Sequence, residues 1–137
     1  MKTINCILLI DDNPADNEFH MIKIKKAQVC KHIKIAIDGP KALDYLIKSG
    51  QEGQSETYPK PDLIFLDINM PGMNGFEFLE EYHKLDDKLK SKVVIVMLST
   101  SLNPDDQKKA TENKDVMEFQ NKPLDIKTLQ ETIDKYF

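Results

Sequence analysis

Acidic side chains follow two apolar segments of the sequence and could together hold a metal ion. Asp11 and Asp12 come directly after the apolar run 4–10, and Asp67 comes directly after the run 63–66. If the two runs are neighbouring parallel strands, the carboxylates meet, and two charges about 4 Å apart repel by about 4 kcal/mol at an effective dielectric constant of about 20. A divalent cation that prefers oxygen ligands relieves this repulsion, and Mg²⁺ is the obvious candidate. A single aspartate at a strand end could simply cap a helix, which does not account for three.

A turn and a possible further oxygen ligand follow Asp67. Pro71 and Gly72 suit the second and third positions of a type II turn, which would fold the chain back sharply. Such a turn could direct the main-chain carbonyl of Asn69 at the metal. An ordinary loop between a strand and a helix explains the proline and the glycine, but it does not explain the aspartate before them.

Hydroxyl and ammonium groups stand at the ends of two later apolar segments. Ser99, Thr100 and Ser101 end the fourth such segment, and Lys122–Pro123 follows the fifth. The three aspartates carry about −3, and Mg²⁺ with Lys122 carries about +3, so a loaded site would be neutral and could attract a phosphoryl group. Taken alone, Lys122 is an ordinary surface lysine before a turn.

These positions lie at the ends of five short segments that have the composition of β-strands. The first, third and fourth are almost continuously apolar, as in parallel strands covered on both faces. The five segments are residues 4–10, 33–37, 63–66, 93–98 and 116–119. Because each is followed by a helical pattern, we expect an α/β, flavodoxin-like (βα)5 fold, an open doubly wound parallel sheet of strand order 2-1-3-4-5 in a three-layer sandwich. This topology predicts a ligand site at the carboxyl ends of the strands.

The first helical pattern begins at Pro14, two residues after Asp12. Ala15, Phe19 and Ile22 form its expected buried stripe, and Ile24 falls off that stripe. We therefore expect the helix to pack on the sheet through these three residues.

The later helical patterns differ in how much apolar surface they offer. The third starts at about Gly75 and extends through Leu85 toward Leu89. The fourth, residues 104–113, is almost wholly polar apart from Ala110, so we expect it to bury little and to be the most loosely held element. The segment 51–61 shows no periodicity and is expected to be a surface loop.

Length, charge and hydropathy exclude several classes of protein. The 137 residues suit one domain with one core. A net charge of −4 provides no general cationic field for nucleic acid. No uninterrupted apolar stretch approaches the roughly 20 residues that span a membrane, because even residues 93–98 and 6–10 are far shorter. Because residues 1–11 also lack the features of a secretory signal, we expect a cytoplasmic protein that binds neither nucleic acid nor membrane.

The chain resembles the receiver domain of two-component response regulators. The resemblance covers essentially the whole chain and depends on four motifs in order: Asp11–Asp12, Asp67 with Met70–Pro71–Gly72, Ser99, and Lys122–Pro123. Each motif is weak alone, but the ordered set is highly specific. Residues 12–16 and the long 51–61 loop also look like those of small single-domain regulators that are paired with phytochrome-type sensor kinases.

The resemblance implies a role for each of these residues. Asp67 is the implied phosphoacceptor, and Ser99 would hydrogen-bond the phosphoryl group. Lys122 would pair with the phosphoryl group across a cis peptide bond to Pro123. Mg²⁺ would be held by the main-chain carbonyl of Asn69 and by the carboxylates of Asp11, Asp12 and Asp67.

The resemblance also implies the kind of partner. The phosphoryl group would come from the phosphohistidine of a sensor histidine kinase or of a histidine phosphotransfer protein, which the family usually docks at the start of the first helix and at the loop after Pro123. The signal would pass on by phosphotransfer or by phosphorylation-controlled binding of a downstream protein. Because no effector domain follows Phe137, we expect residues 1–137 to be a single stand-alone receiver domain that relays a signal and is not an enzyme.

Two positions depart from the commonest form of this family. Ser99 stands where threonine is more frequent, and Phe119 occupies the position of a switch aromatic that is often tyrosine. Without a phenolic hydroxyl, Phe119 could switch only by packing. We hypothesise that phosphoryl capture pulls Ser99 inward, makes room for Phe119 and shifts the polar helix 104–113. Phe119 could equally be a plain core residue.

Two other functions are alternatives to this hypothesis. A haloacid-dehalogenase-like phosphatase also uses an aspartate nucleophile and Mg²⁺, but its second aspartate stands two residues after the nucleophile, whereas this chain has Asp11–Asp12–Asn13. A receiver-shaped scaffold that is never phosphorylated is the other alternative, and the intact acidic and lysine motifs argue against it.

Overall fold

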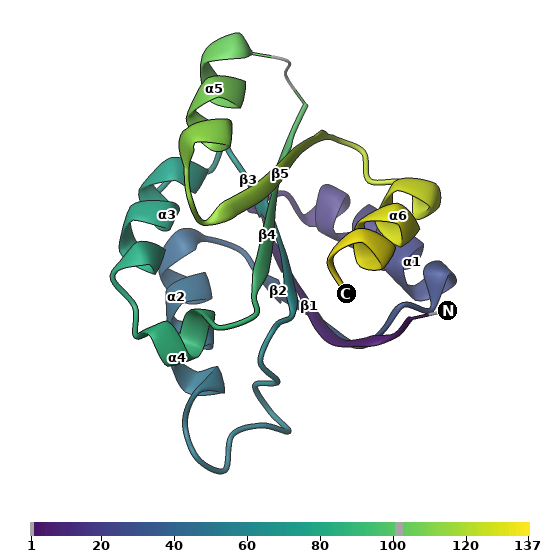
Figure 1. Ribbon diagram of the computed structural model, residues 1–137, viewed down its shortest axis with the longest axis vertical. Coiled ribbons are helices and arrows are strands. Elements are labelled where there is room, and N and C mark those ends of the chain that lie inside the picture. Colours follow the sequence, from purple (N-terminus) through teal and green to yellow (C-terminus); the bar gives the residue numbers. More distant parts are fainter. Residues whose placement is uncertain (1, 101–102) are drawn as a thin grey trace.

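A five-stranded parallel sheet forms the middle layer of the computed structural model, which describes residues 2–100 and 103–137 (Figure 1). The order of the strands in the sheet is β2-β1-β3-β4-β5. The strands are β1 (Ile4–Ile10), β2 (Cys30–Ala36), β3 (Leu63–Asp67), β4 (Val94–Ser99) and β5 (Val116–Asn121). The predicted flavodoxin-like topology is therefore confirmed. β2 begins earlier than predicted, because Cys30 already pairs with Ile4 of β1.

Helices cover both faces of this sheet (Figure 1). They are α1 (Pro14–Ala27), α2 (Gly39–Ser49), α3 (Gly75–His83), α4 (Asp87–Lys90), α5 (Pro104–Glu112) and α6 (Ile126–Tyr136). Figure 1 shows α1 and α6 on one face, and α2, α3 and α5 on the other. None of the helices in the part of the chain that the structure describes is both long and apolar enough to cross a membrane.

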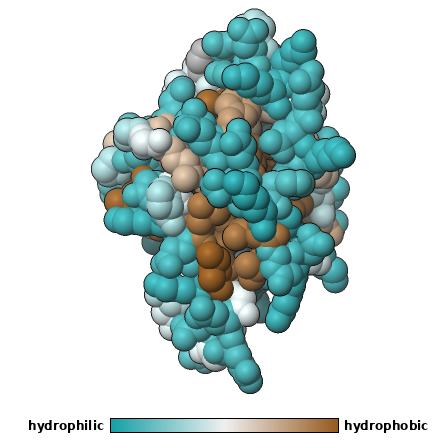
Figure 2. Space-filling view, turned by 90° about the vertical axis from the view of Figure 1, so that its left-hand side faces the viewer, coloured by the Kyte–Doolittle hydropathy of each residue, from teal (hydrophilic) through white to brown (hydrophobic). Residues whose placement is uncertain are grey.

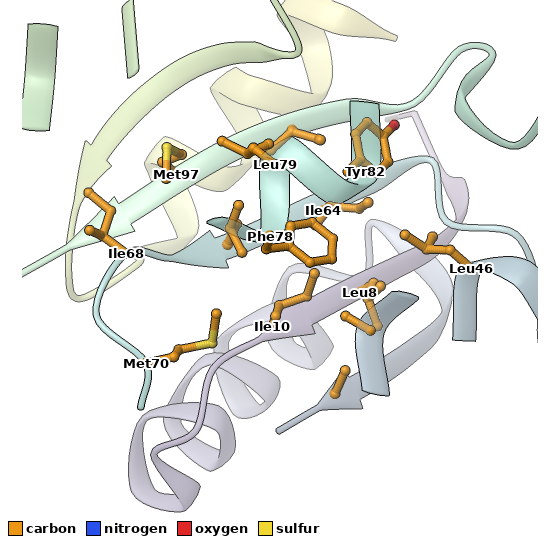
Figure 3. Packing of buried hydrophobic residues seen from close by; sticks show 14 of the residues in the cluster. Leu8, Ile10, Leu46, Ile64, Ile68, Met70, Phe78, Leu79, Tyr82 and Met97 are labelled. Carbon is orange, nitrogen blue, oxygen red and sulfur yellow. The ribbon is translucent and has the colours of Figure 1, made fainter. Parts of the chain in front are cut away.

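The core is divided by the sheet into two apolar clusters. Side chains of a strand point alternately to its two faces, so Leu8 and Ile10 of β1 pack under α2 and α3, while Ile7 and Leu9 pack under α1 and α6. Figure 3 shows the first cluster, in which Phe78 of α3 lies over the sheet. This division explains why β1 is almost continuously apolar in the sequence.

The α2 and α3 side of the molecule also exposes apolar surface. Figure 2 shows apolar side chains gathered in a strip on a face that is otherwise mostly hydrophilic. In α2, Ala42 and Leu46 are fully buried, whereas Ile47 is 45% exposed. The apolar side of this helix is therefore wider than the surface that the core covers.

The predicted buried stripe of α1 is wrong. Ala15 is exposed, and Phe19 and Ile22 are 43% and 47% exposed. Ile24, which was expected to fall off the stripe, is 1% exposed. The buried residues of α1 are Asn17, His20, Ile24 and Ala27.

Hydrogen bonds allow α1 to bury these polar residues. The side-chain amide of Asn17 donates to the main-chain oxygen of Asp11 at 2.8 Å. Nε2 of His20 accepts a hydrogen bond from the main-chain N–H of Leu124 at 3.3 Å. Because partnered polar groups can be buried at little cost, the helix faces the sheet with a side that the apolar periodicity alone does not indicate.

The predicted continuation of the third helix to Leu89 is also wrong. α3 ends at His83, and the separate short helix α4 follows. The Asp86 carboxylate accepts a hydrogen bond from the N–H of Lys88 at 3.0 Å and so caps a new helix. Two other expectations for this half are confirmed, because Ala110 is the buried residue of α5 and residues 51–61 form no helix or strand. The loose attachment of α5 stays a prediction.

Candidate functional site

Three aspartates meet at the carboxyl ends of two adjacent strands. Asp11 and Asp12 follow β1, and Asp67 ends β3, which pairs directly with β1. One carboxylate oxygen from each of the three lies within 4.8 Å of the others. Asp11 and Asp67 are only 4% and 8% exposed. The fold therefore brings together the carboxylates that the sequence predicts to meet.

Asp67 is fixed from behind by the start of α3. The N–H of Gly75 donates to the oxygen of Ile68 at 2.8 Å. A side chain at Gly75 would place its Cβ only 2.6 Å from the main-chain oxygen of Asp67. Glycine is therefore the residue that lets α3 approach this backbone so closely. Asn74 begins the helix with a capping box, in which its side chain and that of Glu77 bond each other's main-chain N–H.

The turn after Asp67 has the conformation that its glycine indicates. Gly72 has a φ of 81°, which suits the third position of the predicted type II turn. Asn69 is exposed between the buried residues Ile68 and Met70. The participation of its carbonyl in metal binding stays a prediction.

The Lys122 ammonium lies among the carboxylates. Its Nζ is 2.5 Å from Oδ2 of Asp11, 2.9 Å from Oδ2 of Asp16 and 3.1 Å from Oδ1 of Asp67. The Lys122 side chain is only 7% exposed. Its main-chain N–H donates to the oxygen of Ser99 at 2.8 Å, and its peptide bond to Pro123 is cis. The residue that follows β5 thus places its ammonium at the carboxyl ends of β1 and β3.

Asp16 is a residue of this site that the sequence reasoning missed. Its position in the first turn of α1 is readable from the sequence, because Asn13 precedes Pro14 and is the cap of the helix. Its partner Lys122 lies 106 residues further along the chain, so no local pattern connects the two. Asp16 adds a fourth negative charge. The site was expected to be neutral when it holds Mg²⁺, and with Asp16 it carries an excess of negative charge.

Burial and the neighbouring charges shift the proton affinities of the site. Burial raises the pKa of Asp67 to about 6, against the opposing effect of the Lys122 ammonium. Burial alone would lower the pKa of Lys122, but the hydrogen bonds to Asp11 and Asp16 outweigh burial and raise it. Burial and the nearby Lys122 charge lower the pKa of His20, which agrees with the role of its Nε2 as an acceptor.

The remaining predicted residues, Ser99 and Phe119, lie on the neighbouring strands β4 and β5. Ser99 ends β4 and is 1% exposed. Phe119 lies opposite Met97 in the sheet and packs half-buried against the apolar core rather than among the carboxylates. Ser101, which was named with Ser99 and Thr100 as a possible hydroxyl donor, lies outside the described residues.

The donor set fits a divalent cation. Carboxylate oxygens are the ligands that Mg²⁺ and similar hard cations prefer. Asp11, Asp12 and Asp67 offer such oxygens within one ligand shell, and Asp12 is the most exposed of the three. A single lysine ammonium leaves this cluster with an excess of negative charge that a divalent cation would balance.

Comparisons with known proteins find a family model and relatives that match most of the chain. The family model described as the response regulator receiver domain matches residues 7–134. The response regulator Rcp1 of Synechocystis is 37% identical over 100 residues, which make up 73% of this chain and 65% of Rcp1. The chain thus spans slightly less than two thirds of that relative.

Solved structures show the same architecture. A two-component response regulator from Cytophaga hutchinsonii has a TM-score of 0.88 and 30% identity, with 98% of both chains covered. The bacteriophytochrome response regulator AtBRR has a TM-score of 0.75 and 30% identity, with 97% of this chain and 92% of that chain covered. The Mn²⁺-bound form of Rcp1 has a TM-score of 0.69 and 31% identity, with 96% and 90% covered.

Proposed function

The chain belongs to the response regulator receiver family, and we propose that it accepts a phosphoryl group on Asp67 from a phosphohistidine. The observation that carries this proposal is the position of the Lys122 ammonium. It lies 3.1 Å from Oδ1 of Asp67 and also contacts the carboxylates of Asp11 and Asp16. Membership of the family supports phosphorylation-based signalling, and the geometry supports Asp67 as the acceptor.

The proposed reaction is an in-line transfer to the Asp67 carboxylate. A carboxylate oxygen forms a bond to phosphorus while the bond from phosphorus to the histidine nitrogen breaks, and the imidazole keeps the electron pair. Lys122 meets the negative charge on the equatorial oxygens of the phosphoryl group. Ser99, buried at the end of β4, donates its hydroxyl to the same group. Hydrolysis of the acyl phosphate returns Asp67 to its resting state.

Asp11, Asp12 and Asp67, with the carbonyl of Asn69, are the residues that would hold Mg²⁺. When bound, Mg²⁺ supplies positive charge that offsets the phosphoryl oxygens and the clustered carboxylates. The Mn²⁺-bound form of the relative Rcp1 supports a divalent cation in proteins of this kind. Asp11 orients the site further, because its Oδ1 accepts the N–H of Asn13 at 3.0 Å and its Oδ2 holds Lys122.

We further propose that residues 1–137 work as a stand-alone receiver in the cytoplasm. The donor would be a sensor histidine kinase or a histidine phosphotransfer protein. The likeness to a bacteriophytochrome response regulator supports a kinase of the phytochrome type. The phosphorylated form would then relay the signal by phosphotransfer or by binding a downstream protein.

Phosphorylation from a small donor tests this proposal. The protein is incubated with Mg²⁺ and acetyl phosphate or phosphoramidate, and its intact mass is measured. A single phosphoryl adduct should form on the parent protein and should be absent in Asp67→Asn and when the metal is chelated. Asp134→Asn, which removes an exposed carboxylate of α6, is the matched control and should react as the parent does. An adduct of equal yield in Asp67→Asn would refute the assignment.

A further inference from the structure

One partner of Lys122 belongs neither to the phosphoacceptor nor to the candidate metal ligands. Asp16 reaches Lys122 from the first turn of α1, with 2.9 Å between its Oδ2 and Nζ. An ammonium has three N–H donors, and Asp11, Asp16 and Asp67 together provide three acceptors around this one. An incoming phosphoryl oxygen must therefore displace or share one of these contacts.

We propose that Asp16 is a positioning residue that competes with the phosphoryl group for Lys122 and thereby lowers the affinity of the site for that group. This inference rests on the proposed function of Asp67. Asp11 and Asp67 also face the candidate metal position, so a bound cation shares their charge. Asp16 does not belong to the group of carboxylates that meet there, so its charge stays directed at Lys122 when a cation binds.

The structure holds Asp16 firmly enough for this role. Its main-chain N–H donates to the Asn13 side chain at 3.1 Å, which fixes the first turn of α1. One turn further along, His20 accepts the N–H of Leu124. Helix α1 therefore contacts the segment after β5 at two points, Lys122 and Leu124. The Asp16 side chain is 36% exposed, so its charge also faces any group that approaches from solvent.

A cavity lies beside this ion pair. Asp16 and Lys122 line a cavity of about 410 Å³ together with Phe19, Thr100 and Pro123. An anionic donor that enters this cavity meets the carboxylate of Asp16 beside the ammonium it needs. The electrostatic effect of Asp16 on a phosphoryl group is therefore unfavourable, both as a like charge and as a competitor for the ammonium.

Binding of beryllofluoride at saturating Mg²⁺, followed by calorimetry or NMR, tests the competition. Asp16→Asn should bind beryllofluoride about two- to fivefold more tightly than the parent, the range expected for loss of a partly exposed ion pair. Asp16→Glu keeps the charge and should restore affinity toward that of the parent. Glu18→Gln is the matched control, because Glu18 is exposed on the same helix and its loss changes the net charge equally. Its affinity should equal that of the parent.

The kinetics of phosphorylation provide a second readout. In Asp16→Asn the acetyl phosphate concentration that gives half the maximal rate should fall two- to fivefold, whereas the maximal rate should change little. Unchanged or weaker beryllofluoride binding by Asp16→Asn would overturn the competition, since it would mean that Asp16 is neutral or helps to orient Lys122 for the phosphoryl group.

Measurements on the metal-free protein separate this inference from the proposed function. The ¹⁵N NMR signal of the Lys122 ammonium should shift in Asp16→Asn and stay unchanged in Glu18→Gln, because of these two side chains it is Asp16 that contacts Nζ. An unchanged signal in Asp16→Asn refutes the ion pair and with it the competition. Failure of the parent protein itself to bind beryllofluoride would instead refute the proposed function of Asp67.

Discussion

Helices α1 and α5 follow β1 and β4, and they are attached to the sheet in opposite ways. α1 buries Ile24 and Ala27 and also ties its polar residues to the neighbouring loops through His20 and Asp16. α5 buries Ala110 alone among its residues. A cavity of about 110 Å³ lies between α5 and β5, next to Phe119. One helix is therefore fixed by packing and by polar contacts, and the other buries little of its surface.

From this difference we expect the domain to combine a precise site beside α1 with a more mobile surface at α5. Phosphoryl transfer needs Lys122 and the carboxylates within tenths of an ångström of their positions, and α1 contributes to that order. A conformational signal needs an element whose displacement requires little free energy. The polar sequence of α5 provides such an element without disturbing the core beneath α1.

The largest expected effect is the difference in stability between substitutions in the two helices. Ile24→Ala in α1 should reduce the free energy of unfolding by about 2–5 kcal/mol, because it leaves a cavity in the core. Ala110→Gly in α5 should reduce it by about 1 kcal/mol, chiefly through backbone entropy. Urea denaturation followed by circular dichroism measures both values. Equal losses would contradict the view that α5 is the weakly attached helix.

A second prediction extends the comparison to the packing behind Asp67. Gly75→Ala should destabilise the protein by about 1–3 kcal/mol, because its Cβ would meet the Asp67 carbonyl oxygen, a backbone atom that cannot move aside. Gly39→Ala is the matched control, since Gly39 also begins a helix but its new Cβ would meet the flexible side chain of Met73. The same denaturation experiment should show a smaller loss of unfolding free energy for the control. An equal loss would mean that the backbone at Asp67 moves to make room for the new methyl group.

The third prediction concerns the charge of the site, which opposes folding. The pKa of Asp67 is raised from its ordinary 3.8 to about 6, so the folded protein binds this proton more tightly than the unfolded chain does. The protonated Asp67 carboxyl therefore favours the folded state. This contribution to the free energy of unfolding is complete below about pH 4 and is lost as the pH rises through about 6. Asp67→Asn removes the charge and should raise the metal-free free energy of unfolding by about 1–2 kcal/mol at pH 8.

Denaturation across a pH series, in the presence of a chelator, measures this gain. The advantage of Asp67→Asn should shrink below about pH 4, and Asp134→Asn should show no such gain at pH 8. Added Mg²⁺ should stabilise the parent more than the variant, because a ligand stabilises the state that binds it. A less stable Asp67→Asn at pH 8 would show that the pair with Lys122 outweighs the burial of the carboxylate.

The predictable parts of the fold were those with strong, local signals. Continuous apolar runs ending in aspartate identified β1 and β3, and the βα alternation led to the strand order. The buried side of α1 was not predictable from apolar periodicity, because Asn17 and His20 take core positions only after hydrogen bonds form with Asp11 and Leu124. The break after α3 depended on a competing cap at Asp86.

The candidate site divides in the same way. The meeting of Asp11, Asp12 and Asp67 follows from the strand order, and Lys122 follows from the family motif. The contact of Asp16 with Lys122 depends on the orientation of α1 against the loop after β5, which no local pattern encodes. Tertiary placement of one helix therefore changed the charge balance of the site from neutral to acidic.

The last and smallest expected effect is dynamic. Amide hydrogens of α5 should exchange faster than those of α1 in the resting protein, because α5 has so little buried surface. Beryllofluoride with Mg²⁺ should change the exchange of residues 104–112 more than that of 14–27, since Ser99 ends the strand that precedes α5 and the cavity beside Phe119 leaves room for its ring to move. Mass-spectrometric hydrogen exchange measures both segments. A change confined to α1 would mean that the tightly held helix, and not the loosely held one, carries the signal.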